Sequence, residues 1–310
     1  NPAGCCFNRQ TGIDDYTLSR TYVCHRHEIV TVVITTEDIL LSYDLRGISK
    51  TRHLLNRHYC SDAASFVLSN SNRIIITTGF YITKGTAAET DGPPGAIALG
   101  LLLDSLGWDV TLLIDEYLLP CLESSLAPEL NTLSFPKASR ELSIAYSQQL
   151  LDDLQPTLLL SIERCGVNAT GRYTNMRGID ISPFTPCIDT LFEFGFPSVG
   201  IGDGGNEIGM GKIREEALSE GIVLPWTTVP TDHLIISSVS NWGAYGLIAE
   251  ICKLTQTNFE KIVTSQEEIL SSMVASGAVD GVTGYQVPTV DSMPYSVHER
   301  ILRTLVRFAA

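Results

Sequence analysis

A glycine-rich segment, Gly200–Lys212, carries the densest group of residues that could do chemistry. It reads GIGDGGNEIGMGK and contains six glycines in thirteen residues. Glycines allow tight turns and let a ligand approach the backbone closely. The carboxylate of Asp203 could bind a divalent metal ion or a substrate ammonium, and Glu207 follows on the same segment. The alternative is a structural turn with an Asx cap. The candidate substrate contacts of this segment are Gly204, Gly205 and Asn206.

A second segment, ETDGPPG at residues 89–95, places two carboxylates just before a helix-like stretch. Two acids in different surroundings can divide the roles of general acid and general base. Glu89 and Asp91 are therefore candidate catalytic residues. The alternative is that Thr90 or Asp91 caps the helix that follows.

Three arginines, Arg164, Arg172 and Arg177, lie within fourteen residues of a chain that has only 21 basic residues against 35 acidic ones. A guanidinium binds a carboxylate through two parallel hydrogen bonds. We expect the three to form a clamp for substrate carboxylates. The alternative is internal pairing with Glu163 and Asp180.

His233 follows an aspartate and is a candidate general base, although a structural histidine explains the residue equally well. Cys165 could be a nucleophile, but no histidine lies near it in the sequence, so we expect a buried thiol.

Short apolar runs alternate with helix-like stretches along the chain, which predicts the elements that position these residues. The expected strands are 74–78, 110–114, 157–162 and 198–201, preceded by a β-branched run at 29–34, while 227–229 and then 234–239 give a fifth strand or the start of a helix. The expected helices are 50–70, 94–106, 140–154, 244–254, 265–276 and 296–308. This alternation predicts a three-layer α/β fold, with a mostly parallel sheet covered by helices on both faces.

In such sheets, ligands bind beyond the carboxyl ends of the strands. Each candidate segment follows an expected strand, so we expect them to meet at one edge of the sheet. Asn241 belongs to a polar segment that could line a pocket or cap the helix from 244, so it is a candidate substrate contact; Thr78, Gly79 and Asn175 become candidates through the motif resemblance given below.

The overall composition limits the class of function. The chain has 310 residues, 44% of them hydrophobic, and a formal net charge of -14. This charge disfavours nucleic acid and acidic membrane surfaces as partners, and no apolar run reaches the ~18 residues of a membrane span. The eight cysteines form no C-x-x-C pair, which argues against a structural zinc site. A chain of this length needs no disulfide framework, so we expect mostly reduced thiols in an intracellular protein. We expect an N-terminal extension over 1–49, partly irregular, and one α/β domain over 50–310.

Several longer motifs together resemble the catalytic domain of the D-glutamate cyclases. They are TGF at 78–80, ETDGPPG at 89–95, YTNMRG at 173–178, GIGDGGNEIGMGK at 200–212, DHLI at 232–235 and SNWG at 240–243. The resemblance covers roughly residues 50–310. It implies a hydro-lyase that converts the small molecule D-glutamate to 5-oxo-D-proline with loss of water. It also implies a mitochondrial matrix location in a eukaryote, or a cytoplasmic one otherwise.

This reaction needs a base for the amine and an acid or Lewis acid for the carboxyl oxygen. The resemblance assigns these roles to Glu89, Asp91, Asp203 and Glu207, with His233 as an alternative base and Mg²⁺ or Mn²⁺ as a possible ligand of Asp203. A homo-oligomer stays open.

Two alternatives stand beside the cyclase. A non-catalytic module that binds small dicarboxylates would keep the arginine clamp and the glycine loop. The segment also resembles the G-D-G-x-N-D metal-binding loop of haloacid-dehalogenase-type phosphatases, but the D-x-D-x-[TV] nucleophile loop of that family is absent.

Overall fold

A computed structural model describes residues 19–23, 29–70, 72–123 and 130–309 of the chain. The chain divides into two compact units, Asn1–Thr35 and Thr36–Ala310. In the first unit, β1 (Ser19–Val23) pairs antiparallel with β2 (Ile29–Val33). The second unit carries all of the candidate site residues.

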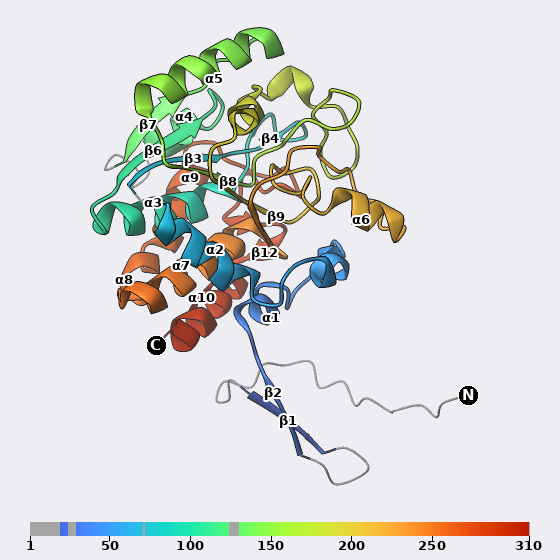
Figure 1. The fold of residues 1–310 in the computed structure, drawn as a ribbon, viewed down its shortest axis with the longest axis vertical. Helices are drawn as coiled ribbons and strands as arrows, with labels where there is room; N and C mark the ends of the chain where they lie inside the picture. Colours follow the sequence, from blue (N-terminus) through green and yellow to red (C-terminus); the bar gives the residue numbers. More distant parts are fainter. Residues whose placement is uncertain (1–18, 24–28, 71, 124–129, 310) are drawn as a thin grey trace. The chain divides into compact units, whose positions relative to one another are not determined.

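The second unit is built on a six-stranded sheet in the order β10-β9-β8-β3-β6-β7 (Figure 1), in which all neighbouring strands are parallel. The strands are β3 (Arg73–Thr78), β6 (Asp109–Ile114), β7 (Asn131–Ser134), β8 (Leu158–Ile162), β9 (Ser198–Gly202) and β10 (His233–Ile236).

Helices cover both faces of this sheet, which confirms the predicted three-layer α/β fold. On one face lie α2 (Tyr59–Ser69), α3 (Pro93–Ser105) and α7 (Ser240–Thr255). On the other face, α5 (Arg140–Leu154) and the 3-10 helix η4 (Ile188–Phe194) pack against alternate residues of β3, β6 and β8 (Figure 1). Both faces of the strands are therefore apolar, which explains why they read as continuous hydrophobic runs.

The remaining elements surround this core. The helical ones are α1 (Thr36–Leu40), η1 (Ile48–Leu54), α4 (Leu119–Glu123), η3 (Ser182–Phe184), α6 (Arg214–Ser219), α8 (Phe259–Val263), α9 (Gln266–Ala275) and α10 (Tyr295–Ala309). Two short hairpins pair β4 (Tyr81–Ile82) with β5 (Ala87–Ala88), and β11 (Thr289–Val290) with β12 (Met293–Pro294). Among the described residues, no helix combines the length and the apolar character needed to cross a membrane.

The structure differs from the sequence prediction in several elements. The expected helix over 50–70 is divided into η1 and α2. The edge strand β7 was not predicted, because its residues NTLS are polar and only partly buried. Of the stretches expected to give a fifth strand or the start of a helix, His233–Ile236 forms the strand β10, and Thr227 makes an isolated bridge with Asn168.

The topology brings the candidate segments together. Strands β3, β8 and β9 are consecutive neighbours in the sheet and end at Thr78, Ile162 and Gly202. The chain that leaves each strand therefore begins at the same edge, where α/β folds bind their ligands.

Candidate active site

A cavity of about 350 Å³ opens among the segments that follow these strands. Three glutamates, Glu89, Glu163 and Glu207, contribute to its lining. Three basic residues also line it: Arg46, Lys84 and Arg177. The cavity therefore combines a compact group of acids with basic residues from three separate segments, which suits a small ligand that carries both signs of charge.

Buried carboxyl groups are the main feature of the site. Oxygens of Asp91, Glu163 and Asp203 lie within 4.8 Å of one another. None of the six acids around the cavity is more than 5% exposed; they are Glu89, Asp91, Glu163, Asp203, Glu207 and Asp291. The sequence predicted four of these acids as catalytic residues, and the fold brings those four into one region.

Asp91 is held at the N-terminus of α7. Its carboxylate accepts hydrogen bonds from the backbone N–H groups of Ser240 (2.9 Å) and Asn241 (2.8 Å), and from that of Gly92 (2.9 Å). The first N–H groups of a helix have no intrahelical partner, and the helix dipole favours a negative charge there. The location of Asp91 is thus fixed by the start of a sixteen-residue helix.

Asn241 fixes the turn that carries these acids. Its side-chain oxygen accepts from the N–H groups of Gly92 (3.1 Å) and Gly95 (2.9 Å), and its amide nitrogen donates to the carbonyl of Thr90 (3.1 Å). Gly92 has φ 94°, and a Cβ atom there would lie 2.6 Å from Cβ of Glu163. Asn241, expected to contact substrate, therefore holds the turn in place, and the turn requires glycine at position 92.

The glycine-rich loop folds around one of its own acids. The N–H groups of Gly204 and Gly205 donate to the carboxylate of Glu207, at 2.9 Å and 2.8 Å. Asn206 lines the cavity and donates to the carbonyl of Thr174 (2.9 Å), while its side-chain oxygen has no hydrogen-bond partner among the described residues. The side-chain oxygen of Asn206 can therefore accept a hydrogen bond from a ligand, whereas the N–H groups of Gly204 and Gly205 already donate to Glu207.

Burial shapes the electrostatics of the whole group. It raises the pKa of Glu89 and of Glu163 well above the usual value, and neighbouring carboxylates add to the effect. Burial also raises the pKa of Asp91 to about 7 and that of Glu207 in the same direction. Charged carboxylates lose hydration when buried, so they bind protons or cations instead. The site can therefore hold both protonated and ionised carboxyl groups near neutral pH.

Arg46, on the loop between α1 and η1, is the basic residue closest to these acids. Its guanidinium forms ion pairs with Asp203 and Asp291. Burial alone would lower the pKa of Arg46, but these two carboxylates raise it well above the usual value. No motif marks Arg46 in the sequence, and the sequence analysis did not name it as a candidate.

Two of the acids that the sequence analysis did not assign to the site, Glu163 and Asp291, lie in a strained backbone conformation. Their φ values are 48° and 51°, in the left-handed region, and Ser292 follows with φ 62°. Such strain in residues other than glycine is typical of functional sites. Asp280 fixes the loop by accepting from the N–H of Ser292 (2.7 Å) and the hydroxyl of Thr289 (2.7 Å). Glu163 could have been found because it directly follows strand 157–162, whereas Asp291 carries no sequence signal.

The comparison with known families bears directly on this site. A family model described as D-glutamate cyclase-like, C-terminal, matches residues 38–306. The chain belongs to the D-glutamate cyclase-like family. The match begins before Arg46 and extends beyond Asp291, so it includes every residue of the acidic group.

A curated member of this family is similar over most of the chain. The human protein named "D-glutamate cyclase, mitochondrial" is 29% identical over an alignment of 328 residues, which covers 90% of this chain. The same alignment covers 53% of the human protein, so the chain spans about half the length of this relative.

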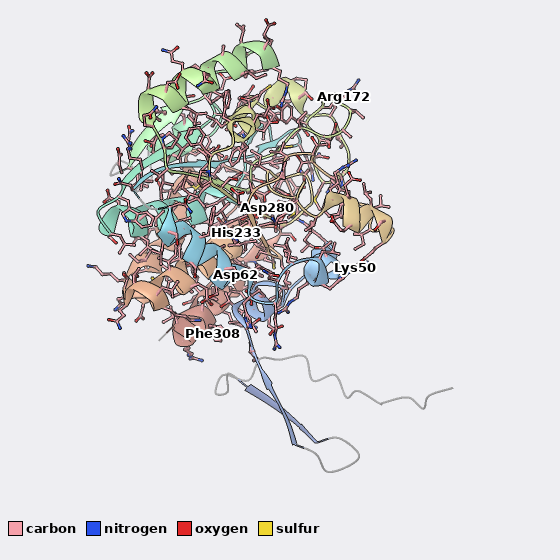
Figure 2. All side chains as sticks on the ribbon, in the orientation of Figure 1. Lys50, Asp62, Arg172, His233, Asp280 and Phe308 are labelled. Atoms are coloured by element: carbon pink, nitrogen blue, oxygen red, sulfur yellow. The ribbon has the colours of Figure 1, made fainter. Side chains whose placement is uncertain are left out.

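The predicted arginine clamp is only partly present at the cyclase-like site. Arg164 is buried, forms an ion pair with Asp115 and donates to the carbonyl of Gly79 (2.8 Å), so it ties two loops together. Arg172 has a side chain that is 64% exposed, lies at the periphery of the molecule (Figure 2) and pairs with Asp180 at 3.1 Å. Arg177 alone among the three lines the cavity.

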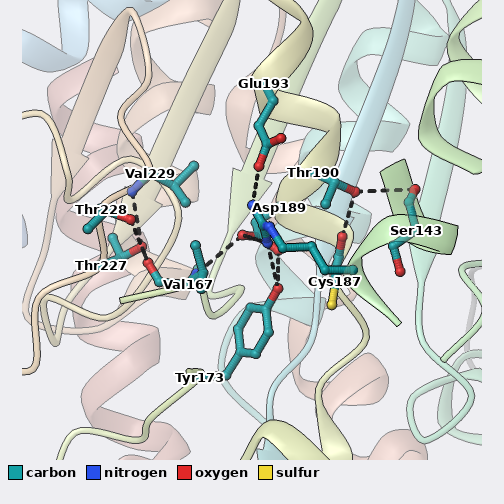
Figure 3. A network of polar contacts seen from close by, with 12 residues as sticks. Ser143, Val167, Tyr173, Cys187, Asp189, Thr190, Glu193, Thr227, Thr228 and Val229 are labelled. Atoms are coloured by element: carbon teal, nitrogen blue, oxygen red, sulfur yellow. Dashed lines mark hydrogen bonds and ion pairs between the residues drawn. The ribbon is translucent and has the colours of Figure 1, made fainter. Parts of the chain in front are cut away.

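A polar network fixes the loop that carries Arg177. Asp189, which is buried, accepts from the hydroxyl of Tyr173, from Arg140 (3.2 Å) and from the N–H of Val167 (3.3 Å) (Figure 3). Within the loop, the side chain of Asn175 accepts from the N–H groups of residues 177 (2.9 Å) and 179 (3.0 Å). Asn175 therefore shapes the turn that presents Arg177, and it also lines the cavity.

His233 lies apart from the acids of the site. It begins β10, where it is paired with Val199, whereas Asp203 follows the last residue of β9. The two residues are therefore at opposite ends of the sheet. The ring of His233 packs on Phe66 with centroids 4.5 Å apart, and burial and Lys212 lower its pKa. This placement gives His233 no direct access to the cavity.

Thr78 and Gly79, expected to contact substrate, and Cys165, expected as a buried thiol, are not among the residues that line the cavity. Thr78 is buried at the end of β3, and its hydroxyl has no hydrogen-bond partner within the described part of the chain. Gly79 accepts the hydrogen bond from Arg164 and has φ 105°. Cys165 is buried, and burial raises its pKa, which makes a thiolate nucleophile unfavourable there.

Proposed function

We propose that this protein closes the ring of glutamate to give 5-oxoproline and water, with preference for the D enantiomer. Family membership supports the reaction class. The observation that carries the proposal is the cavity of about 350 Å³ with three buried glutamates and three basic residues in its lining. This combination suits a small substrate that carries two carboxylates and one ammonium.

The reaction requires proton transfers that the buried acids can perform. The α-amine nitrogen attacks the γ-carboxyl carbon, the C–N bond forms, and a C–O bond breaks to release water. Two protons move from nitrogen to the leaving oxygen, with no net uptake or release. One ionised carboxylate can accept a proton from the amine while one protonated carboxyl group donates to oxygen. Glu89, Glu163 and Glu207 line the cavity and are the groups within reach.

Charge recognition would place the substrate for this step. Lys84 and Arg177 are exposed where they line the cavity, so they can receive the α-carboxylate from solvent. The ammonium is then attracted toward the glutamates. Holding the chain folded removes much of the entropic barrier to ring closure.

We also propose that Asp91, Glu163 and Asp203 can bind Mg²⁺ or Mn²⁺. Hard divalent cations prefer carboxylate oxygens, the three groups lie within 4.8 Å of one another, and Oδ2 of Asp203, whose Oδ1 pairs with Arg46, has no hydrogen-bond partner among the described residues. A bound cation would act as a Lewis acid on a carboxyl oxygen. Calorimetric titration with each metal tests this, and the heat of binding should be lost in Asp203→Asn.

Turnover tests the proposed function. The protein is incubated with D-glutamate and with L-glutamate, each with and without Mg²⁺ or Mn²⁺, and 5-oxoproline is followed by mass spectrometry. We expect product from D-glutamate. If neither enantiomer is converted under any of these conditions but glutamate binds, the protein is a binding module and the cyclase proposal fails.

The name of the human relative supports a mitochondrial location for this protein if its source is eukaryotic. Fluorescence microscopy of the tagged full-length protein would test this proposal.

A further inference from the structure

Arg46 stands out because it faces an excess of negative charge. Six buried acids lie around the cavity, and Arg46 forms ion pairs with two of them, Asp203 and Asp291. Its side chain stays 16% exposed and lines the cavity. Arg46 therefore contacts buried carboxylates on one side and open space on the other.

The attachment of Arg46 is rigid. One terminal nitrogen pairs with Asp203 and the other with Asp291. Asp291 sits in a strained turn, and Asp203 directly follows β9. The loop of Arg46 is itself held by Asp44, whose carboxylate accepts from the N–H groups of Gly47 (2.7 Å) and residue 49 (2.9 Å). A guanidinium has five N–H donors, so a guanidinium anchored through two of them keeps others to offer.

A second buried arginine shows what a purely structural pair looks like in this protein. Arg164 and Asp115 have side chains that are 1% and 3% exposed. Arg164 also donates to the carbonyls of Gly79 (2.8 Å) and Pro186 (3.3 Å), so its donors are directed at protein groups. The described contacts of Arg46 are with carboxylates only, and it borders the cavity, so the structural explanation that fits Arg164 does not account for Arg46.

We propose that Arg46 binds the reacting γ-carboxylate of the substrate, and that Asp203 and Asp291 are positioning residues that hold its guanidinium toward the cavity. This inference rests on the proposed function. The cavity then offers Arg46 to one carboxylate, the exposed Lys84 and Arg177 to the other, and three glutamates to the ammonium. Glutamate carries this same set of charges. A bidentate guanidinium would also hold the γ-oxygens beside the acids that protonate them.

Binding measurements test the role of Arg46 separately from turnover. The full chain is titrated calorimetrically with D-glutamate and with glutarate, which lacks the amine. Arg46→Ala should weaken the binding of both ligands about 10- to 100-fold, the range for a lost charged hydrogen bond. Arg46→Lys should keep part of the affinity. Arg52→Ala is the matched control, because Arg52 lies in the neighbouring η1, pairs with Asp38 and does not line the cavity.

Chemical rescue tests the positioning role of the two aspartates. Methylguanidine added to Arg46→Ala should restore part of the affinity for glutarate, because Asp203 and Asp291 still form the anchor. The same addition to Arg46→Ala combined with Asp291→Asn should restore little. Circular dichroism and thermal melts establish that each variant is folded, and Arg46→Lys carries the test if the alanine variant is not.

Several outcomes would overturn the inference. If Arg46→Ala binds both ligands as tightly as the wild type, Arg46 does not contact substrate. If it binds them more tightly, the Arg46 side chain blocks the cavity, and ligands must displace it to bind. The proposed function fails separately: a wild type that binds glutamate through Arg46 but makes no 5-oxoproline is not a cyclase. If the wild type and Arg46→Ala both make 5-oxoproline with the same KM, the proposed cyclase function stands and the inference about Arg46 is refuted. A wild type that binds neither ligand and makes no product refutes both.

Discussion

Replacing Asp203 with asparagine should stabilise the metal-free protein near neutral pH. The Asp203 carboxyl group is fully buried, and burial raises its pKa well above the usual 3.8, although Arg46 opposes the rise. Because the shift is upward, the folded chain holds a proton on this group to a higher pH than the unfolded chain does. The folded chain therefore binds more protons than the unfolded chain in this pH range, and its free energy of unfolding falls as the pH rises. Asparagine keeps the shape and removes this penalty.

The sign and size of the effect follow from linkage. A carboxyl group whose folded pKa is raised contributes full stability below its unfolded pKa, and that contribution is lost as pH rises through the folded pKa. The loss is about 1.4 kcal/mol per pH unit. That slope applies between the unfolded and the folded pKa, so the raised pKa of Asp203 sets the direction of the effect. Asp91, with a pKa of about 7, adds a similar slope in both proteins.

Urea unfolding with a chelator present measures this directly. As the pH rises above the unfolded pKa, the wild type should lose more stability than Asp203→Asn, by up to about 1.4 kcal/mol per pH unit. His233 and His298 have lowered pKa values through burial and act with the opposite sign, but they cancel in the comparison. Asp153→Asn, on an exposed part of α5, is the control and should follow the wild type. An identical pH dependence in Asp203→Asn and the wild type would refute the argument that burial holds this carboxyl group protonated.

Three further substitutions test how the site is built. Gly92→Ala should destabilise the fold by about 1–3 kcal/mol, because its Cβ would lie 2.6 Å from Cβ of Glu163 at φ 94°; an unchanged melting curve would contradict this. Asn241→Ala leaves the N–H of Gly95 and the carbonyl of Thr90 without this partner, while the N–H of Gly92 keeps Asp91, and it should cost about 2 kcal/mol in urea unfolding; unchanged stability would contradict this. Arg177→Ala should raise KM about 10-fold or more, whereas Arg303→Ala on α10 should not; equal KM values would remove Arg177 from the site.

The sequence predicted the sheet well because its strands are buried on both faces. Runs such as 74–78 and 157–162 are continuous and apolar, and each ends at a polar segment, so the rule for carboxyl ends of parallel strands could be applied. That rule correctly grouped Glu89, Asp91, Asp203 and Glu207. The edge strand β7 was not predicted because an edge strand buries little apolar surface, so its residues NTLS do not form an apolar run.

The sequence could not reveal residues that reach the site from outside the sheet. Arg46 comes from the loop after α1, and Asp291 from a strained turn after β11; both positions depend on how distant segments pack. The arginine cluster misled for the opposite reason. Nearness in sequence suggested one clamp, but Arg164 is directed inward to Asp115 and Arg172 outward to Asp180.

His233 shows a further limit of motif reasoning. The segment DHLI begins a strand, so its histidine lies at the amino end of β10, away from the edge where ligands bind. The position of a polar residue relative to the direction of its strand is thus as informative as its chemistry.

Oxygen exchange tests the central claim most directly. Ring closure and its reverse together exchange a γ-carboxylate oxygen of glutamate with solvent, whichever side the equilibrium favours. D-glutamate is incubated with the protein in ¹⁸O-labelled water, and the label in recovered glutamate is measured by mass spectrometry. The account predicts ¹⁸O in the γ-carboxylate with the wild type and at least about a 100-fold slower exchange with Glu163→Gln, the scale for losing a general acid or base. Unlabelled D-glutamate after prolonged incubation with the folded wild type, with and without Mg²⁺ or Mn²⁺, would contradict it.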